Sequence, residues 1–160
     1  MVRLPTRRLL AALAASAALF MVASASAQAA WQPTTPSTPS MTAAGSAFCS
    51  GSYSTIPALR FRACVIADSV TGGAKVRSAV QVTNVTHTPR WVSAVSETIV
   101  SGRVRDSYNC GKILLRPSYV ATCVGRQSFV PDGGYAYARG KVYDYSSRRW
   151  GTAYSPVYRP

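Results

Sequence analysis

The chain has 160 residues, a formal net charge of +13, four Cys and one His. This length suits one domain, or one domain with a tail. Only five residues are acidic, which excludes an acidic calcium loop and argues against catalysis by clustered carboxylates. The composition therefore gives no indication of an enzyme.

Residues 1–27 are typical of a secretory signal peptide. Three Arg precede an apolar stretch over Leu9–Val22, and Ala25–Ala27 matches an A-x-A cleavage site, with cleavage two residues later as the second choice. A transmembrane anchor is the alternative, but spanning a bilayer needs about 20 apolar residues. We therefore expect a secreted, extracellular protein whose mature chain has no transmembrane segment.

The mature chain keeps a strong positive charge. Without the leader, 15 cationic residues face five acidic ones, for a net charge of +10, and 12 of the 15 are Arg. Such a charge suits an anionic cell-wall polymer, a membrane surface or an acidic protein partner. Nucleic acid is not expected as a partner, because the extracellular compartment offers little of it.

The next segment, residues 28–47, is an uncharged arm rich in Pro, Ser and Thr. This low-complexity composition predicts an extended chain, which in polyproline II form reaches about 3.1 Å per residue. Trp31 is a large apolar residue near the free end of the arm. It indicates either a tether whose Trp anchors in a partner's pocket, or a solvated linker with an incidental Trp.

The four Cys are Cys49, Cys64, Cys110 and Cys123. In an exported protein, an even count predicts two disulfides. Three connectivities are possible, and we favour Cys49–Cys64 with Cys110–Cys123 because each closes a short loop. No two Cys are two residues apart and the chain has one His, so neither a CxxC redox site nor a zinc site is expected.

From residue 48 to residue 160 the pattern is that of an all-β domain. Short alternating or β-branched runs are separated by turn signals such as Thr71–Gly73, Ser101–Gly102 and Pro131–Gly134. The expected strands span residues 59–66, 74–83, 90–100, 104–110, 113–115, 119–124, 135–145 and 150–158. This spacing predicts a disulfide-stapled antiparallel sandwich, immunoglobulin-like in the loose sense, with a small barrel as the main alternative.

The strand expected over residues 135–145 has two unlike faces. Small residues occupy its even positions, and its odd positions form what we call the tyrosine-cation strip: Tyr135, Tyr137, Arg139, Lys141, Tyr143 and Tyr145. Tyr and Arg are favoured at interface hot spots, and they also suit sugars. We expect the strip to bind a partner, and the alternative is an ordinary outer sheet face. Trp150 and Tyr154 extend the same surface if their strand pairs beside this one.

Catalytic, metal and cofactor sites are not expected. His87 reads as a loop residue, no G-x-S-x-G elbow marks a nucleophilic Ser, and the disulfides leave no free Cys. Glycoside hydrolysis needs two facing carboxylates, and Glu97 is the only Glu. We therefore expect a non-enzymatic protein without a cofactor.

The layout of leader, arm, paired cysteines and basic Tyr-rich end resembles small secreted actinobacterial β-sandwich proteins. Among them it is similar to the adaptor subunit of umbrella toxin particles. In that family a small exported sandwich links a lectin-bearing subunit to a large toxin stalk, and an extended N-terminal segment docks into the lectin-bearing partner. The resemblance implies that residues 28–47 are the docking segment here, with Trp31 as its anchor.

The favoured hypothesis is a secreted binding protein that acts as an adaptor in an extracellular, toxin-type assembly. The arm would contact one secreted protein, for example a lectin-bearing subunit, and the tyrosine-cation strip another, for example a toxin subunit. The alternative is a cationic module that binds cell wall or carbohydrate, or a small secreted inhibitor or antimicrobial. High salt separates the two, because screening weakens adhesion to a polyanion more than a packed protein interface.

Overall fold

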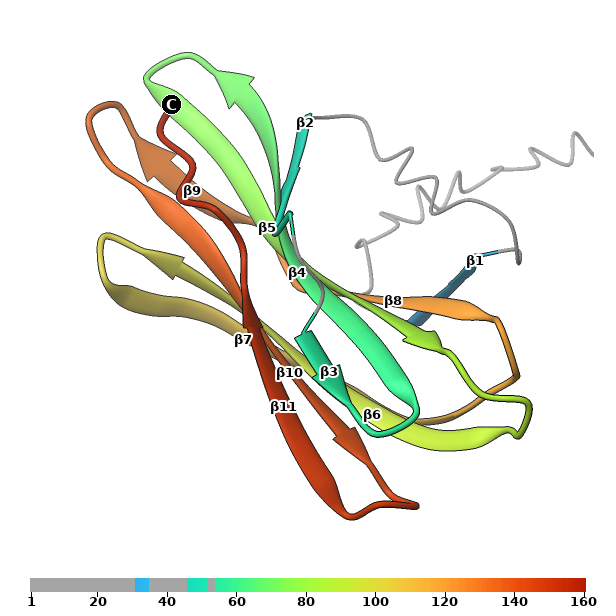
Figure 1. Ribbon diagram of the computed structural model, residues 1–160. Helices are drawn as coiled ribbons and strands as arrows, with labels where there is room; N and C mark the ends of the chain where they lie inside the picture. Colours follow the sequence, from blue (N-terminus) through green and yellow to red (C-terminus); the bar gives the residue numbers. More distant parts are fainter. Residues whose placement is uncertain (1–30, 35–45, 52–53) are drawn as a thin grey trace, which may run out of the picture.

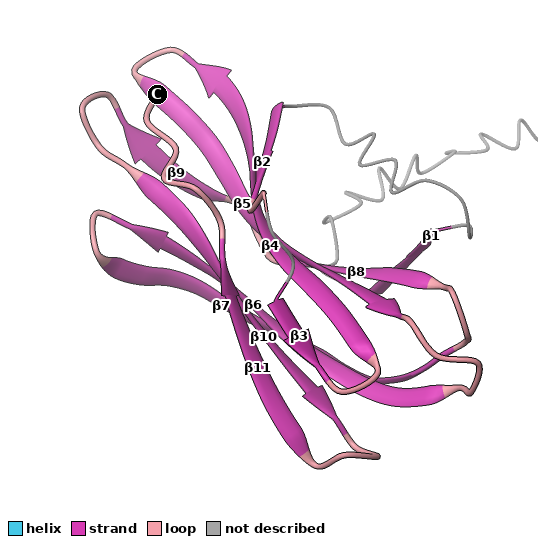
Figure 2. Ribbon diagram, in the orientation of Figure 1, coloured by secondary structure: helices cyan, strands magenta, loops and turns pink. Residues whose placement is uncertain are grey.

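The computed structural model describes residues 31–34, 46–51 and 54–160. The expected signal peptide lies outside the described residues, as do the parts of the arm between residues 28 and 30 and between 35 and 45. The described chain forms strands, turns and loops, and none of it is helical (Figure 2). Within these residues, accordingly, no helix is long and apolar enough to cross a membrane.

Eleven strands are present in the described part of the chain (Figure 1). In chain order they are β1 (Trp31–Thr34), β2 (Ser46–Cys49), β3 (Ser54–Ile56), β4 (Leu59–Val70), β5 (Gly73–Asn84), β6 (Arg90–Val100), β7 (Arg103–Leu115), β8 (Val120–Val124), β9 (Ser128–Pro131), β10 (Ala136–Asp144) and β11 (Arg149–Tyr154). The strands at 59–66, 74–83, 90–100, 119–124 and 135–145 were therefore predicted within a few residues. The all-β prediction is confirmed.

The strands form two antiparallel sheets. The larger has the order β1-β8-β5-β4-β2, with β3 also paired to β4 and β9 to β5, and the smaller has the order β11-β10-β6-β7. Their inner faces enclose one apolar core, in which Phe61, Val80 and Val142 are fully buried. Two face-to-face antiparallel sheets around one core define a sandwich, so the barrel alternative is wrong.

Strand β10 alternates as the sequence predicts. Its even positions from Ala136 to Asp144 are all buried, and its odd positions are half-buried on the opposite face. Gly140 is needed where β10 packs closely against β5, because a Cβ on it would lie 2.6 Å from Cγ2 of Val80. The small residues of β10 therefore let the two sheets approach, and the tyrosine-cation strip points away from the core.

Strand β7 is the largest departure from the predicted strands. The sequence indicates two strands, at 104–110 and 113–115, but the structure has one strand from Arg103 to Leu115 whose register with β6 shifts twice. Gly111 lies inside it at φ 75°, a conformation that glycine adopts without strain. The irregularity that interrupted the sequence pattern is thus a β-bulge within a continuous strand.

Both disulfides have the favoured pairing. Cys49–Cys64 joins the adjacent strands β2 and β4, and Cys110–Cys123 joins β7 to β8 and so ties one sheet to the other. The arm also contributes to the fold, because β1 extends the larger sheet beyond β8, and the first residues of β2 belong to the segment that we assigned to the arm.

Candidate protein-binding face

The outer face of the four-stranded sheet brings the tyrosine-cation strip beside residues from three other strands. Strand β11 pairs with β10, so that Tyr143 lies opposite Trp150 and Arg139 lies opposite Tyr154. On the other side of β10, strand β6 places Ser93 opposite Tyr143, and β7 places Lys112 opposite Ser93. The C-terminal strand therefore pairs beside β10, and Trp150 and Tyr154 extend the tyrosine-cation strip.

One end of this face carries a continuous group that we call the aromatic cluster: Trp91, Lys112, Tyr143, Tyr145 and Trp150. The ring of Tyr143 contacts Trp150 at 4.9 Å and Tyr145 at 4.8 Å between centroids. The Lys112 ammonium lies 4.4 Å from the centroid of Tyr145 and 4.8 Å from that of Trp91. Each contact joins the next, so the cluster crosses all four strands of the sheet.

The aromatic cluster is unusually open for residues of this kind. The exposed fraction is 59% for Trp150, 46% for Trp91 and 39% for Tyr145, and Leu114 beside Trp91 is 48% exposed. Large apolar side chains gathered in this way on a monomer's surface commonly mark an interaction site. Scattered single residues would carry no such meaning.

The middle of the face is an ion-pair network around Glu97. Arg139 and Lys141 both donate to the Glu97 carboxylate, Lys141 at 3.0 Å from Oε1. Burial acts to raise the pKa of Glu97, but the two hydrogen-bonded cations outweigh it and hold that pKa below its ordinary value. The hydrogen bond to Glu97 raises the pKa of Arg139 in turn. Both of the strip's cations therefore share one carboxylate, which offsets one of their two positive charges.

Other strip residues lie away from the aromatic cluster. Tyr137 faces Tyr154 at 6.4 Å between ring centroids, on the far side of the ion-pair network. Tyr135 precedes β10, and its ring contacts the guanidinium of Arg159 at 5.5 Å. The structure thus divides the six strip residues, with only Tyr143 and Tyr145 in the aromatic cluster.

Trp31 is in contact with the body of its own chain. Strand β1 pairs with β8, with Trp31 opposite Cys123, and the indole Nε1 donates to the carbonyl of Gly111 in β7 at 3.2 Å. The half-buried indole packs against the core between the two sheets. The partner-binding role expected for Trp31 stays a prediction, and any such role begins from this intramolecular position.

The sequence pattern did not indicate Trp91, Lys112 or Leu114 as surface residues. Residues 90–100 form a run rich in β-branched residues, of the kind that suits a buried strand, yet Trp91 lies on the outer face of β6. The signal was present in the alternation of β6, because Val92 and Ala94 are buried and Trp91 has the opposite parity. Only the strand order β11-β10-β6-β7 brings these residues next to Tyr143.

The described residues include few side chains of the types that metal and nucleophilic sites use. No cluster of three or more His, Cys, Asp or Glu side chains there could hold a metal ion, and the described cysteines are all disulfide-bonded. His87 is an exposed loop residue. Asp144, the last residue of β10, is fully buried, and its carboxylate accepts hydrogen bonds from the Ser146 amide and the Ser147 hydroxyl in the turn that follows.

The face belongs to a disulfide-linked β-sandwich, and comparison with known proteins adds little to that class. No family model and no curated protein matches the sequence. Solved structures of Bacteroides uniformis beta-glucuronidase are similar at 10–11% identity and TM-scores of 0.43–0.44, over 61–69% of this chain. The chain spans only 12% of the length of those enzymes, and likeness of this degree carries no argument about function.

Proposed function

We propose that this is a secreted, non-enzymatic protein that binds another protein through the outer face of its four-stranded sheet. The observation that carries the proposal is the exposed aromatic cluster, which crosses the sheet from Trp91 to Trp150. Trp and Tyr are the residues most enriched at the energetic centres of protein interfaces. Both disulfides suit the oxidising compartment that such a protein occupies.

The geometry of the rings favours a protein partner over a glycan. Stacking on successive sugar rings calls for aromatic faces that lie open and roughly parallel. Here Tyr143 is inclined by 77° to Tyr145 and by 38° to Trp150, and Lys112 sits over the rings of Trp91 and Tyr145. Such a faceted surface suits complementary packing by side chains from a partner.

The adaptor role is the fuller form of this proposal. An adaptor needs a second contact, and the resemblance to umbrella-toxin adaptors assigns it to the arm, in contact with a lectin-bearing subunit. Because Trp31 rests on β8 and β7 of its own chain, that contact requires either release of β1 or binding by arm residues on either side of it. The alternative, adhesion to cell wall or carbohydrate, rests on the net positive charge.

A pull-down from native culture supernatant tests the proposal. The baits are the intact protein, Trp150→Ala, and the control Phe129→Ala, which removes a 52% exposed aromatic from the other sheet. Washing at about 1 M salt reduces the reach of electrostatics to about 3 Å. We expect defined proteins to stay bound to the intact protein and to Phe129→Ala, and to be lost from Trp150→Ala.

Two results would contradict the proposal. Complete release of every partner by high salt would favour adhesion to a polyanion through general positive charge. Retention of the same proteins by Trp150→Ala and by a second variant, Trp91→Ala, would place the binding surface elsewhere.

A further inference from the structure

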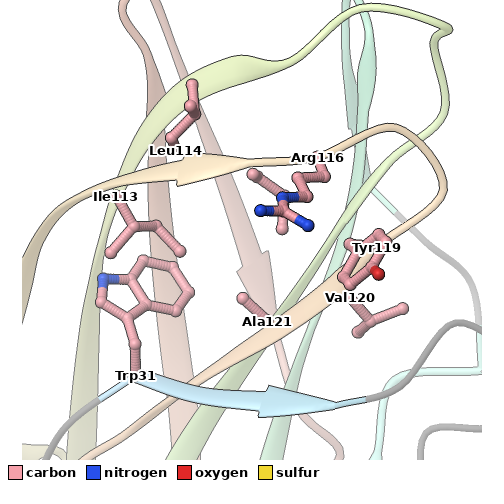
Figure 3. Close-up of a pocket in the computed structure, with 8 residues that line it drawn as sticks. Trp31, Ile113, Leu114, Arg116, Tyr119, Val120 and Ala121 are labelled. Atoms are coloured by element: carbon pink, nitrogen blue, oxygen red, sulfur yellow. The ribbon is translucent and has the colours of Figure 1, made fainter.

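A groove of about 280 Å³ lies where the edge of one sheet meets the edge of the other (Figure 3). Strands β1 and β7 are the last strands of their sheets on this side. The groove is lined from both of them and from the start of β8, by Trp31, Ile113–Leu115, Arg116 and Tyr119–Ala121. Its walls are almost entirely apolar, although it is open to solvent.

Trp31 forms one wall and holds the two edges together. Its indole extends from β1 to β7, where it donates to the Gly111 carbonyl. Arg116 lies on the turn between β7 and β8, and Figure 3 shows its guanidinium directed toward the space between Tyr119 and Ile113. The groove therefore combines an apolar floor with one cation and has no acidic lining residue.

The size of the groove indicates the kind of ligand. Sites for metabolites and drug-sized molecules usually have volumes of about 300–1,000 Å³ and enclose most of the ligand. This groove is smaller and open, and a single large apolar side chain would occupy it. A carboxylate beside that side chain would pair with Arg116, because a guanidinium binds carboxylates through two parallel hydrogen bonds.

The groove is also continuous with the aromatic cluster. Leu114 lines the groove, and its direct cross-strand partner is Trp91 at one end of the cluster. A partner that covers Trp91 would therefore also meet the mouth of the groove. The surface that runs from the groove to Trp91 carries two cations, Arg116 and Lys112. Their charge would attract an acidic segment of a partner.

We infer that the groove is the anchor pocket of the protein-binding face, and that it takes a large apolar side chain flanked by carboxylates from an extended segment of the partner protein. This inference rests on the proposed function. It adds a second contact site, at the edge of the sandwich, and a partner chemistry that the aromatic cluster alone does not specify.

The test uses the intact protein and a random-peptide phage library as the probe, with washes at about 1 M salt, where screening removes adhesion through net charge. Selected peptides are synthesised and their affinities measured against four variants. Ala121→Leu extends a buried lining residue into the groove, and Arg116→Glu reverses its charge. Arg60→Glu makes the same charge change at an exposed site on β4, and Trp150→Ala alters the aromatic cluster.

We expect the selected peptides to share a large apolar residue next to Asp or Glu. Their affinity should fall by about tenfold or more in Ala121→Leu and in Arg116→Glu, and should stay unchanged in Arg60→Glu. Amide chemical shifts in the labelled protein should move at 113–121. Arg116→Glu changes an exposed turn residue, so it remains informative even if Ala121→Leu does not fold.

Failure of this inference can be told apart from failure of the proposed function. If no peptide is enriched, or if enriched peptides bind both groove variants unchanged, the groove is not an anchor pocket. A supernatant partner lost only from Trp150→Ala would then leave the protein-binding face in place. If neither peptide nor partner responds to any of these variants, both proposals are wrong.

Discussion

Removal of the Trp31 side chain should weaken the fold measurably, even though the residue lies in a segment with the composition of a linker. Replacing a fully buried Trp by Ala costs about 3–5 kcal/mol, and a typical hydrogen bond contributes about 1 kcal/mol. Trp31 is half-buried and makes one hydrogen bond, to the Gly111 carbonyl. We therefore expect Trp31→Ala to lower the free energy of unfolding by about 2 kcal/mol.

The matched control is Trp150→Ala, because Trp150 is 59% exposed at the edge strand β11. The same atoms are removed there, and the cost should stay within about 0.5–1 kcal/mol. Guanidinium denaturation followed by circular dichroism gives both values, and hydrogen exchange should show faster opening of β8 in Trp31→Ala alone. Equal costs for the two variants would mean that β1 contributes nothing to stability.

Two further predictions concern the charged network and the contact between the sheets. The folded-state pKa of Glu97 lies below its ordinary value of 4.5, so its ion pairs contribute stability above that value, and the contribution is lost as the pH falls through the folded-state pKa. Acid titrations of stability should show this loss in the wild-type protein and not in Glu97→Gln. Gly140→Ala should cost about 1–3 kcal/mol by overpacking against Val80, whereas the control Gly51→Ala, with no atom within 4 Å of the added Cβ, should be near neutral in thermal melts.

The alternation of side chains explains why much of the body could be predicted from the sequence. In β4, β5 and β10 one parity is apolar or small over many residues, and those residues are the ones that face the core. Strand β9 and strand β3 were missed because each is too short to show a period. They are strands because β4 and β5 are each long enough to pair with two short strands along one edge, β2 and β3 on β4, and β8 and β9 on β5.

The candidate site was predicted only in part, for a different physical reason. A single strand's pattern shows which residues share its outer face, and this found Tyr143 and Tyr145. It does not show which strand lies beside it, so the contacts with Trp91 and Lys112 depend on pairing of segments far apart in the chain. The pairing of Arg139 with Glu97 has the same origin, since β6 and β10 are neighbours in the sheet but are separated in the chain by β7, β8 and β9.

The docked position of Trp31 sets a quantitative limit on any role of the arm in a second contact. If docking of β1 stabilises the chain by about 2 kcal/mol, the released form is about 3% of the population. A partner that binds only the released arm then has an apparent affinity for the intact protein about 30-fold weaker than its affinity for a free arm peptide. An adaptor that works through its arm therefore needs a partner that outcompetes β8. A variant that weakens the pairing of β1 with β8 but keeps Trp31 should therefore bind that partner more tightly than the wild-type protein does.

A covalent lock tests this competition without altering the aromatic cluster or the groove. Gln32 is the direct cross-strand partner of Thr122, so Gln32→Cys with Thr122→Cys should form a disulfide that fixes β1 on β8. The control is the single variant Gln32→Cys with its thiol capped, and peptide mapping verifies the pairing. If the arm binds in its released form, the locked protein should lose one partner from native supernatant and the capped control should keep it. Equal retention by both proteins would show that partners recognise the sandwich with its arm in place, through the outer face of the four-stranded sheet or the groove beside Trp31, and would contradict binding by a released arm.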